Sequence, residues 1–120
     1  MNPLHQHQPF TAHREASWAR DGYNRDWRII PPGGTLTLAE IDGPGAITHL
    51  WFAIDNDHTV TDPLFPRKTT LRVFWDGHDE PSLNVPVGDF FGVGHGTVSN
   101  YTSALFDMSI NPDAQRGAFN

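Results

Sequence analysis

The sequence predicts an all-β domain, an antiparallel β-sandwich of the jelly-roll type with one short N-terminal helix. Three observations predict this class. Eleven glycines and ten prolines in 120 residues supply many turns. Short apolar segments with a period of two recur between these turns. No alternation of strands with helices occurs, which argues against a parallel nucleotide-binding sheet.

The chain divides into a polar N-terminal arm, residues 1–14, and the N-terminal part of the jelly-roll domain, residues 15–120. Thr11–Arg20 contains good helix formers and neither glycine nor proline, so we expect the one short helix there. Asp21 and Gly22 end it.

Five segments have the pattern of strands. Residues 35–41 alternate, and residues 46–54 are apolar on both faces, as in a central strand. Residues 69–75 and 82–87 flank a turn-rich segment and form the clearest hairpin. Residues 101–110 form a further strand, and residues 111–120 read as a loop. Because so few strands leave the edge of a sandwich open, we expect the chain to be the N-terminal part of a longer protein.

Charge and composition exclude several classes of partner. The net charge of −6, without any basic run, argues against nucleic acid. No run of eight apolar residues occurs, so no membrane span is expected. Without cysteine or a secretory signal pattern, the chain is expected to be cytoplasmic and to lack disulfides and thiolate sites.

The stretch VPVGDFFGVGHG, residues 85–96, has the composition of a site. A phosphate loop would need a following helix and a lysine, and both are missing. Two interpretations stay open: a functional loop, or a bend in which glycine permits positive φ. In either case the strand ends here and presents Asp89 and His95 at the rim of the sheet.

A metal site or other cofactor is not expected. The seven histidines share no ligand spacing, and His5 and His7 lie in the polar arm. His49 and His95 are the exceptions worth testing, because apolar residues or glycines surround them. Asp55-Asn56-Asp57 could bind Ca²⁺ but reads as a solvated turn, since it lacks the pattern of an EF-hand loop.

A sugar site is one interpretation of Asn24-Arg25-Asp26-Trp27, which combines polar groups for hydroxyls with an indole for a ring face. A loop fixed by a salt bridge is an equal alternative. Catalysis is not expected from this chain. Glycoside hydrolysis needs a carboxylate pair, and none of the three glutamates is flanked by an apolar pocket: Glu15, Glu40 and Glu80.

Four segments together carry a resemblance to a known family: residues 27–33, 41–51, 71–77 and 85–92. In this order they resemble the N-terminal part of glycoside hydrolase family 172, over about residues 15–120. The family's N-terminal motif is also matched, by Ser17, Trp18, Arg20, Gly22, Asn24 and Asp26. Ala19 stands where the family has an acidic residue and Tyr23 where it has a glycine, so specificity is expected to differ.

The resemblance implies a double jelly roll that assembles into trimers or hexamers. It implies a retaining furanosidase with a glutamate pair and no metal, acting on α-D-fructofuranosides, difructose dianhydrides or D-arabinofuranosides. We expect the two glutamates beyond residue 120, so that the 120 residues alone are inactive.

The resulting hypothesis is the N-terminal portion of a furanosidase-like hydrolase, with a small carbohydrate as its partner. It contributes fold and substrate pocket but no catalytic residue. We expect hydroxyl contacts from Asn24, Asp26 and Asp89, a pocket wall from Trp51 or Phe91, and His95 close by. The alternative is a non-catalytic jelly roll for carbohydrate binding or assembly.

Overall fold

The computed structural model describes residues 9–54, 62, 64–95, 99–111 and 116–119. The chain divides into two compact units, Met1–Gly45 and Ala46–Asn120. Each unit is described by itself below.

The first unit contains turns but neither helix nor strand between residues 9 and 45. The Gly22 N–H donates to the Ala19 carbonyl over 3.1 Å, and the Gly34 N–H donates to the Pro31 carbonyl over 2.8 Å. The predicted helix over Thr11–Arg20 is therefore wrong, and so is the predicted strand over residues 35–41.

Hydrogen bonds outside any helix explain the first of these differences. The Ser17 hydroxyl donates to the Asp26 carbonyl, and Arg28 Nη2 donates to the Trp18 carbonyl over 3.2 Å. A helix of ten residues is marginal in water unless one face packs against something. Only Ala16 and Ala19 are half-buried between residues 11 and 20. The helix propensity of the segment is therefore not supported by packing of a helix face.

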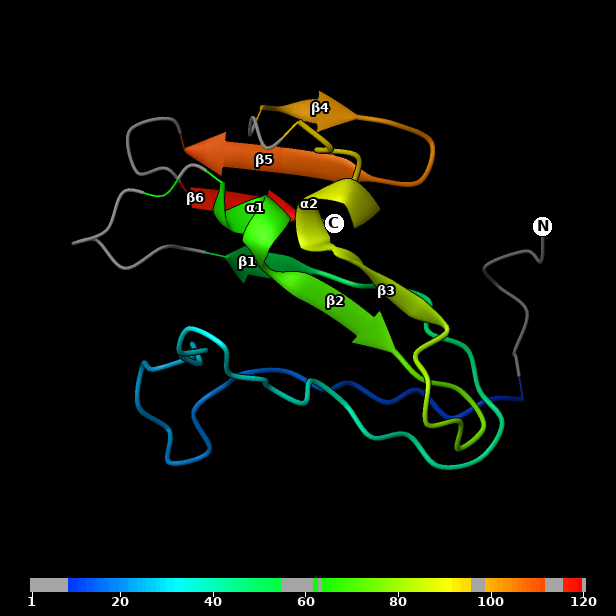
Figure 1. Cartoon of the computed structure of the whole chain (residues 1–120). Coiled ribbons are helices and arrows are strands. Elements are labelled where there is room, and N and C mark those ends of the chain that lie inside the picture. The colour runs from blue at the N-terminus through cyan, green and yellow to red at the C-terminus, as the bar shows by residue number, and fades with distance from the viewer. Residues whose placement is uncertain (1–8, 55–61, 63, 96–98, 112–115, 120) are drawn as a thin grey trace. The chain divides into compact units, whose positions relative to one another are not determined.

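The second unit is built on a four-stranded antiparallel sheet in the order β1-β6-β5-β4 (Figure 1). Its strands are β1 (Phe52–Ile54), β4 (Tyr101–Thr102), β5 (Asp107–Asn111) and β6 (Arg116–Phe119). Phe119 pairs with Phe52 on one side and with Met108 on the other, which fixes the register of β6 in the middle of the sheet.

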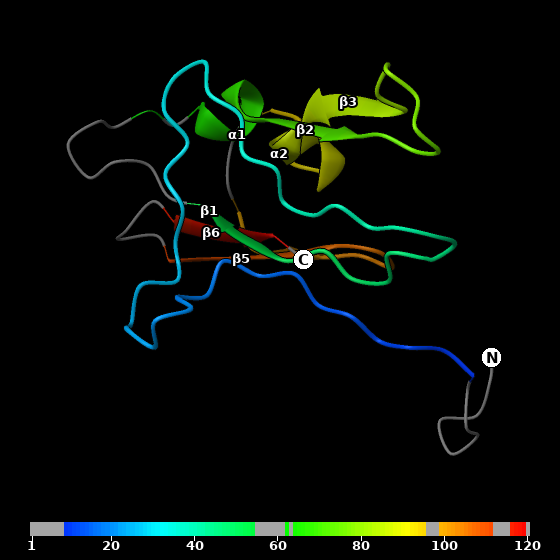
Figure 2. The same cartoon turned by 90° about the horizontal axis from the view of Figure 1, so that it is seen from below.

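A second layer lies over this sheet in both views (Figures 1 and 2). It consists of the hairpin β2 (Thr70–Val73) and β3 (Leu83–Pro86) and of two one-turn helices, α1 (Phe65–Lys68) and α2 (Val87–Phe90). Thr70 pairs with Pro86 and Val73 with Leu83, so the predicted hairpin is confirmed. Neither helix exceeds four residues, so no described helix is long enough to span a membrane.

Three further predictions about strands need correction. Residues 46–54 form no long central strand, because only Phe52–Ile54 pair, at one edge of the sheet. Residues 101–110 form two strands, since the Ser103 N–H donates to the Phe106 carbonyl over 2.8 Å and turns the chain between them. Residues 111–120 are predicted as a loop, but they contain β6. Its turn-like composition gives no strand signal, and pairing with β1 and β5 stabilises it as a strand.

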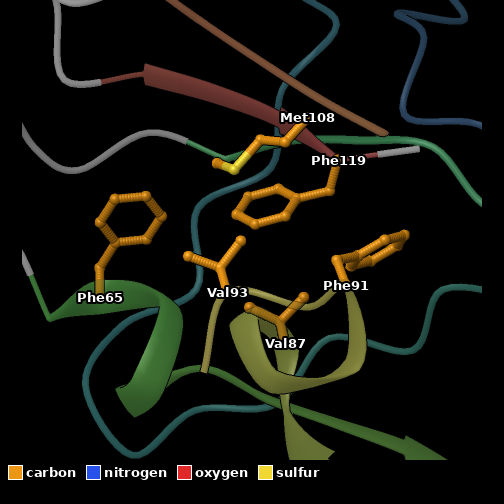
Figure 3. Packing of buried hydrophobic residues seen from close by; sticks show 6 residues of the cluster. All are labelled: Phe65, Val87, Phe91, Val93, Met108 and Phe119. Atoms are coloured by element: carbon orange, nitrogen blue, oxygen red, sulfur yellow. The ribbon is translucent and has the colours of Figure 1, made fainter. Parts of the chain in front are cut away.

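The core lies between the two layers (Figure 3). Phe65, Val87, Phe91 and Val93 reach it from the helices and the loop after α2, and Met108 and Phe119 reach it from the sheet (Figure 3). Burial of these side chains is the main force that holds the layers together. Antiparallel sheets with two short helices confirm the predicted all-β class; the jelly-roll topology stays a prediction.

Candidate functional site

The predicted site residues fall into both units. Asn24 and Asp26 belong to the first unit, where both are exposed. Trp51, Asp89, Phe91 and His95 belong to the second unit. Asp89 lies in α2, Phe91 follows it directly and His95 lies further along the loop, whereas Trp51 directly precedes β1.

Helix α2 points Asp89 and Phe91 in different directions. Successive residues of a helix are about 100° apart, so two positions differ by about 200°. Asp89 Oδ1 accepts a hydrogen bond from Arg67 Nη1 of α1 over 2.8 Å. Phe91, by contrast, is 1 % exposed and belongs to the core. The residues after β3 therefore serve one ion pair and one aromatic cluster, on opposite sides.

Phe91 lies at the centre of four aromatic rings. Its ring centroid is 5.0 Å from Phe90, 5.4 Å from Phe119, 5.7 Å from Phe106 and 5.8 Å from Phe52. Edge-to-face pairs at such distances are favourable beyond the apolar area that they bury. This cluster joins α2 to β1, to β6 and to the turn between β4 and β5.

Trp51 lies on the other face of its strand. Phe52 packs against Phe91, and side chains alternate along a strand, so Trp51 and Ala53 point away from the core. The indole of Trp51 is accordingly exposed. Of the two residues predicted as a pocket wall, Phe91 thus lies at the centre of the aromatic cluster and Trp51 lies outside it.

The loop after α2 shows why glycine is needed at one position. Gly92 has a φ of +83°, a region that side-chain-bearing residues avoid, and a Cβ there would lie 3.3 Å from the Tyr101 hydroxyl oxygen. That oxygen is buried and finds no hydrogen-bond partner among the described residues. Burial raises the pKa of Tyr101, and the nearby Asp107 carboxylate raises it further. The predicted bend is confirmed at Gly92.

An aromatic groove of about 470 Å³ opens beside α2. Its walls come from the segment before β1, the turn end of the β2–β3 hairpin, the end of α2 and the β4–β5 turn. Its lining includes Thr48, His49, Trp75, Ser82, Phe90, Phe91 and Phe106.

The lining of this groove is neutral. Among the described residues that line it there is no Asp, Glu, Lys or Arg, and His49 is the one titratable side chain. A charged ligand would lose hydration here without gaining an opposite charge, which disfavours its binding. Aromatic walls with a few polar groups are typical of sites for small neutral molecules.

A second hollow, of about 620 Å³, belongs to the first unit. Arg20, Asp21, Arg25, Trp27 and Arg28 line it, but Asn24 and Asp26 do not. Arg25 pairs with Asp21 over 3.4 Å. This pair matches the alternative interpretation of the Asn24–Trp27 segment, a loop fixed by a salt bridge.

The structure offers no metal centre in the part that it describes, where no three His, Asp or Glu side chains converge. The other candidates, His5, His7 and Asp55-Asn56-Asp57, lie outside the described residues. The three glutamates are exposed. Glu15 and Glu40 do not line the hollow of their own unit, and Glu80 does not line the groove of the second unit.

Sequence reasoning missed Arg67 and Phe106. Arg67 follows a proline in a segment without a motif, and its partner lies 22 residues further along the chain, so no local signal reveals the pair. The prediction of one strand over residues 101–110 gave no reason to place Phe106 in the aromatic cluster. The turn at Ser103, whose hydroxyl accepts from the Phe106 N–H over 2.9 Å, would have been the signal.

Comparison with known proteins gives one match. A family model described as GH172 domain-like matches residues 23–109, well over half of the 120 residues. The matched interval includes every residue that lines the aromatic groove. Neither the curated proteins nor the solved structures give a match.

Proposed function

We propose a function for this chain on the premise that it belongs to the GH172 domain-like family. Membership relates the chain to glycoside hydrolases. The proposal is that the aromatic groove binds one neutral furanoside unit and contributes this subsite to a furanosidase acting on α-D-fructofuranosides, difructose dianhydrides or D-arabinofuranosides.

The neutral aromatic lining of the groove carries the proposal. A furanose ring presents C–H groups that pack on an aromatic face and hydroxyls that need hydrogen-bond partners. Trp75 is half-exposed and offers such a face, while Thr48 and Ser82 bring hydroxyls to the same groove. Because no ionised side chain of Asp, Glu, Lys or Arg lines it, the groove favours an uncharged sugar over a phosphorylated one.

Binding without hydrolysis is expected of these 120 residues. Cleavage of a glycosidic bond needs two carboxyl groups on either side of it. The described residues of the groove lining include no carboxylate, which supports binding in place of catalysis at this groove. Asp89 and His95 of the second unit do not line the groove. The sugar contacts expected of them and of Asn24 and Asp26 stay predictions.

The test is an equilibrium titration with methyl α-D-arabinofuranoside and methyl α-D-fructofuranoside, measured by isothermal titration calorimetry, which reports binding without a tryptophan. Trp75→Ala is expected to weaken binding about fivefold, because loss of one aromatic contact costs about 1 kcal/mol. Arabinose 5-phosphate should bind more weakly than the neutral arabinofuranoside.

Trp51→Ala is the matched control. Trp51 is 57 % exposed and Trp75 49 %, but only Trp75 lines the groove. Equal weakening by both substitutions, or absence of saturable binding by the unsubstituted chain, would contradict the proposal. Release of p-nitrophenol from a p-nitrophenyl α-furanoside by this chain would contradict the separate claim that it lacks catalytic carboxylates.

A second candidate function, assembly, rests on the apolar surface of the second unit. Trp51, Phe74 and Leu105 are all exposed, and Leu105 is 82 % exposed. Where such side chains form a contiguous patch, another protein typically covers it. We propose self-association into a trimer or hexamer. Light scattering after size exclusion tests it, and a monomer at all concentrations would contradict it.

A further inference from the structure

We propose that Arg67 is a positioning residue, which braces α2 and the loop after it so that Phe90 and Phe91 form the wall of the groove. In this view Asp89 acts through Arg67 and does not contact the sugar. The inference rests on the proposed function for its binding consequence, but the brace itself can be tested without a ligand.

The brace consists of one guanidinium nitrogen with two acceptors. Arg67 Nη1 donates to Asp89 Oδ1 over 2.8 Å and also to the Gly94 carbonyl oxygen. Asp89 lies within α2 and Gly94 lies in the loop after it. A single side chain of α1 therefore ties down both the helix and the loop that leaves it.

Close backbone packing limits how α2 can lie against α1. A Cβ on Gly88 would lie 2.8 Å from the Pro66 Cβ and 3.2 Å from the Val93 carbonyl oxygen. The Val93 N–H donates to the Gly88 carbonyl over 2.6 Å, which folds the loop back onto α2. Arg67 follows Pro66 directly, so the polar contact and the close packing act at the same junction.

The brace reaches the groove through the geometry of α2. Phe90 follows Asp89 directly, and its ring lies 5.6 Å from Phe106 across the lining. A rotation of this one-turn helix that released Asp89 from Arg67 would turn Phe90 and Phe91 with it, since all three share the same backbone. Arg67 can thus affect sugar binding although it does not line the groove.

The experiment compares Arg67→Ala with Lys68→Ala. Both substitutions remove one positive charge from α1, but Lys68 pairs with Asp62 and not with α2. Amide hydrogen exchange at Val93 is expected to accelerate in Arg67→Ala and to stay unchanged in Lys68→Ala. The Kd for methyl α-D-arabinofuranoside is expected to rise about twofold to fivefold in Arg67→Ala alone, the range for a partly exposed ion pair.

Asp89→Asn decides whether Asp89 acts through Arg67. If it does, adding Asp89→Asn to Arg67→Ala changes the Kd no further. An additional loss in the double variant would overturn the proposal, because Asp89 would then contact the sugar directly. Arg67→Lys keeps a donor and is expected to restore part of both the exchange protection and the affinity.

The outcomes separate this inference from the proposed function. If the unsubstituted chain binds no furanoside, the proposed function fails, while Val93 exchange still reports on the brace. If Arg67→Ala and Lys68→Ala give the same Val93 exchange rate or the same Kd, the positioning role of Arg67 is refuted even though the groove binds sugar.

Discussion

Replacement of Phe91 by alanine tests whether this ring belongs first to the core or to the groove. Phe91 is 1 % exposed and contacts four other aromatic rings. Truncation of a buried phenylalanine costs about 3–5 kcal/mol, as the sum of lost transfer energy and the cavity that remains. The neighbours come from both layers, so they cannot close the cavity together, and we expect a loss of about 4 kcal/mol.

Urea unfolding followed by circular dichroism measures this loss. With a slope of about 2 kcal/mol per molar urea, the midpoint should fall by about 2 M. Phe91→Leu retains most of the apolar volume and should cost only about 1–1.5 kcal/mol, which keeps the comparison possible if the alanine variant does not fold. Trp51→Ala, an exposed position, should stay within about 0.5 kcal/mol.

A loss of less than about 1 kcal/mol in Phe91→Ala, the central value for an average substitution, would contradict the placement of Phe91 in the core. If Phe91→Ala weakened furanoside binding and lowered the free energy of unfolding by so little, Phe91 would contribute to the groove and not to the stability of the core.

The remaining predictions concern three local features. Gly88→Ala should destabilise by about 1–3 kcal/mol through overpacking, whereas Gly94→Ala, whose Cβ would lie 3.8 Å from the nearest atom beyond its chain neighbours, should be tolerated in thermal unfolding. Tyr101→Phe should raise the free energy of unfolding by up to about 1 kcal/mol, because it removes a buried hydroxyl without a partner among the described residues; a loss would reveal a partner. The Lys68 side chain, and then the Leu64 N–H, lower the pKa of Asp62 below 3.8. This stabilisation is present above pH 3.8 and is lost as the pH falls further, so the acid arm of a stability–pH curve should shrink in Asp62→Asn.

The hairpin could be predicted from the sequence because its signals are local. Leu71 and Val73 alternate with polar or exposed neighbours, and a turn-rich segment separates the two strands. The N-terminal segments failed for the opposite reason. The good helix formers between Thr11 and Arg20 permit a helix, and the alternating pattern over residues 35–41 permits a strand. Neither pattern supplies the partner that a helix face or a strand edge requires.

The candidate site was partly predictable on the same grounds. The stretch of residues 85–96 was singled out by its glycines, and Gly92 does adopt a positive φ. Phe91 is predicted as a possible pocket wall and not as the centre of a core cluster, because nothing local shows that Phe119 and Phe52 converge on it from distant parts of the chain. Family resemblance supplied the function class, which the groove residues alone would not have indicated.

The one-turn helix α2 explains how so short a stretch can serve both the fold and the proposed site. In an extended strand, Asp89 and Phe91 would point to the same face, because side chains two residues apart do so. The helical turn separates them, so that the carboxylate meets Arg67 outside the core while the ring enters the aromatic cluster. A strand continuing through these residues would have required either a buried carboxylate or an exposed phenylalanine. The helix avoids both, and Gly88 permits it because no side chain could fit against Pro66 at that point.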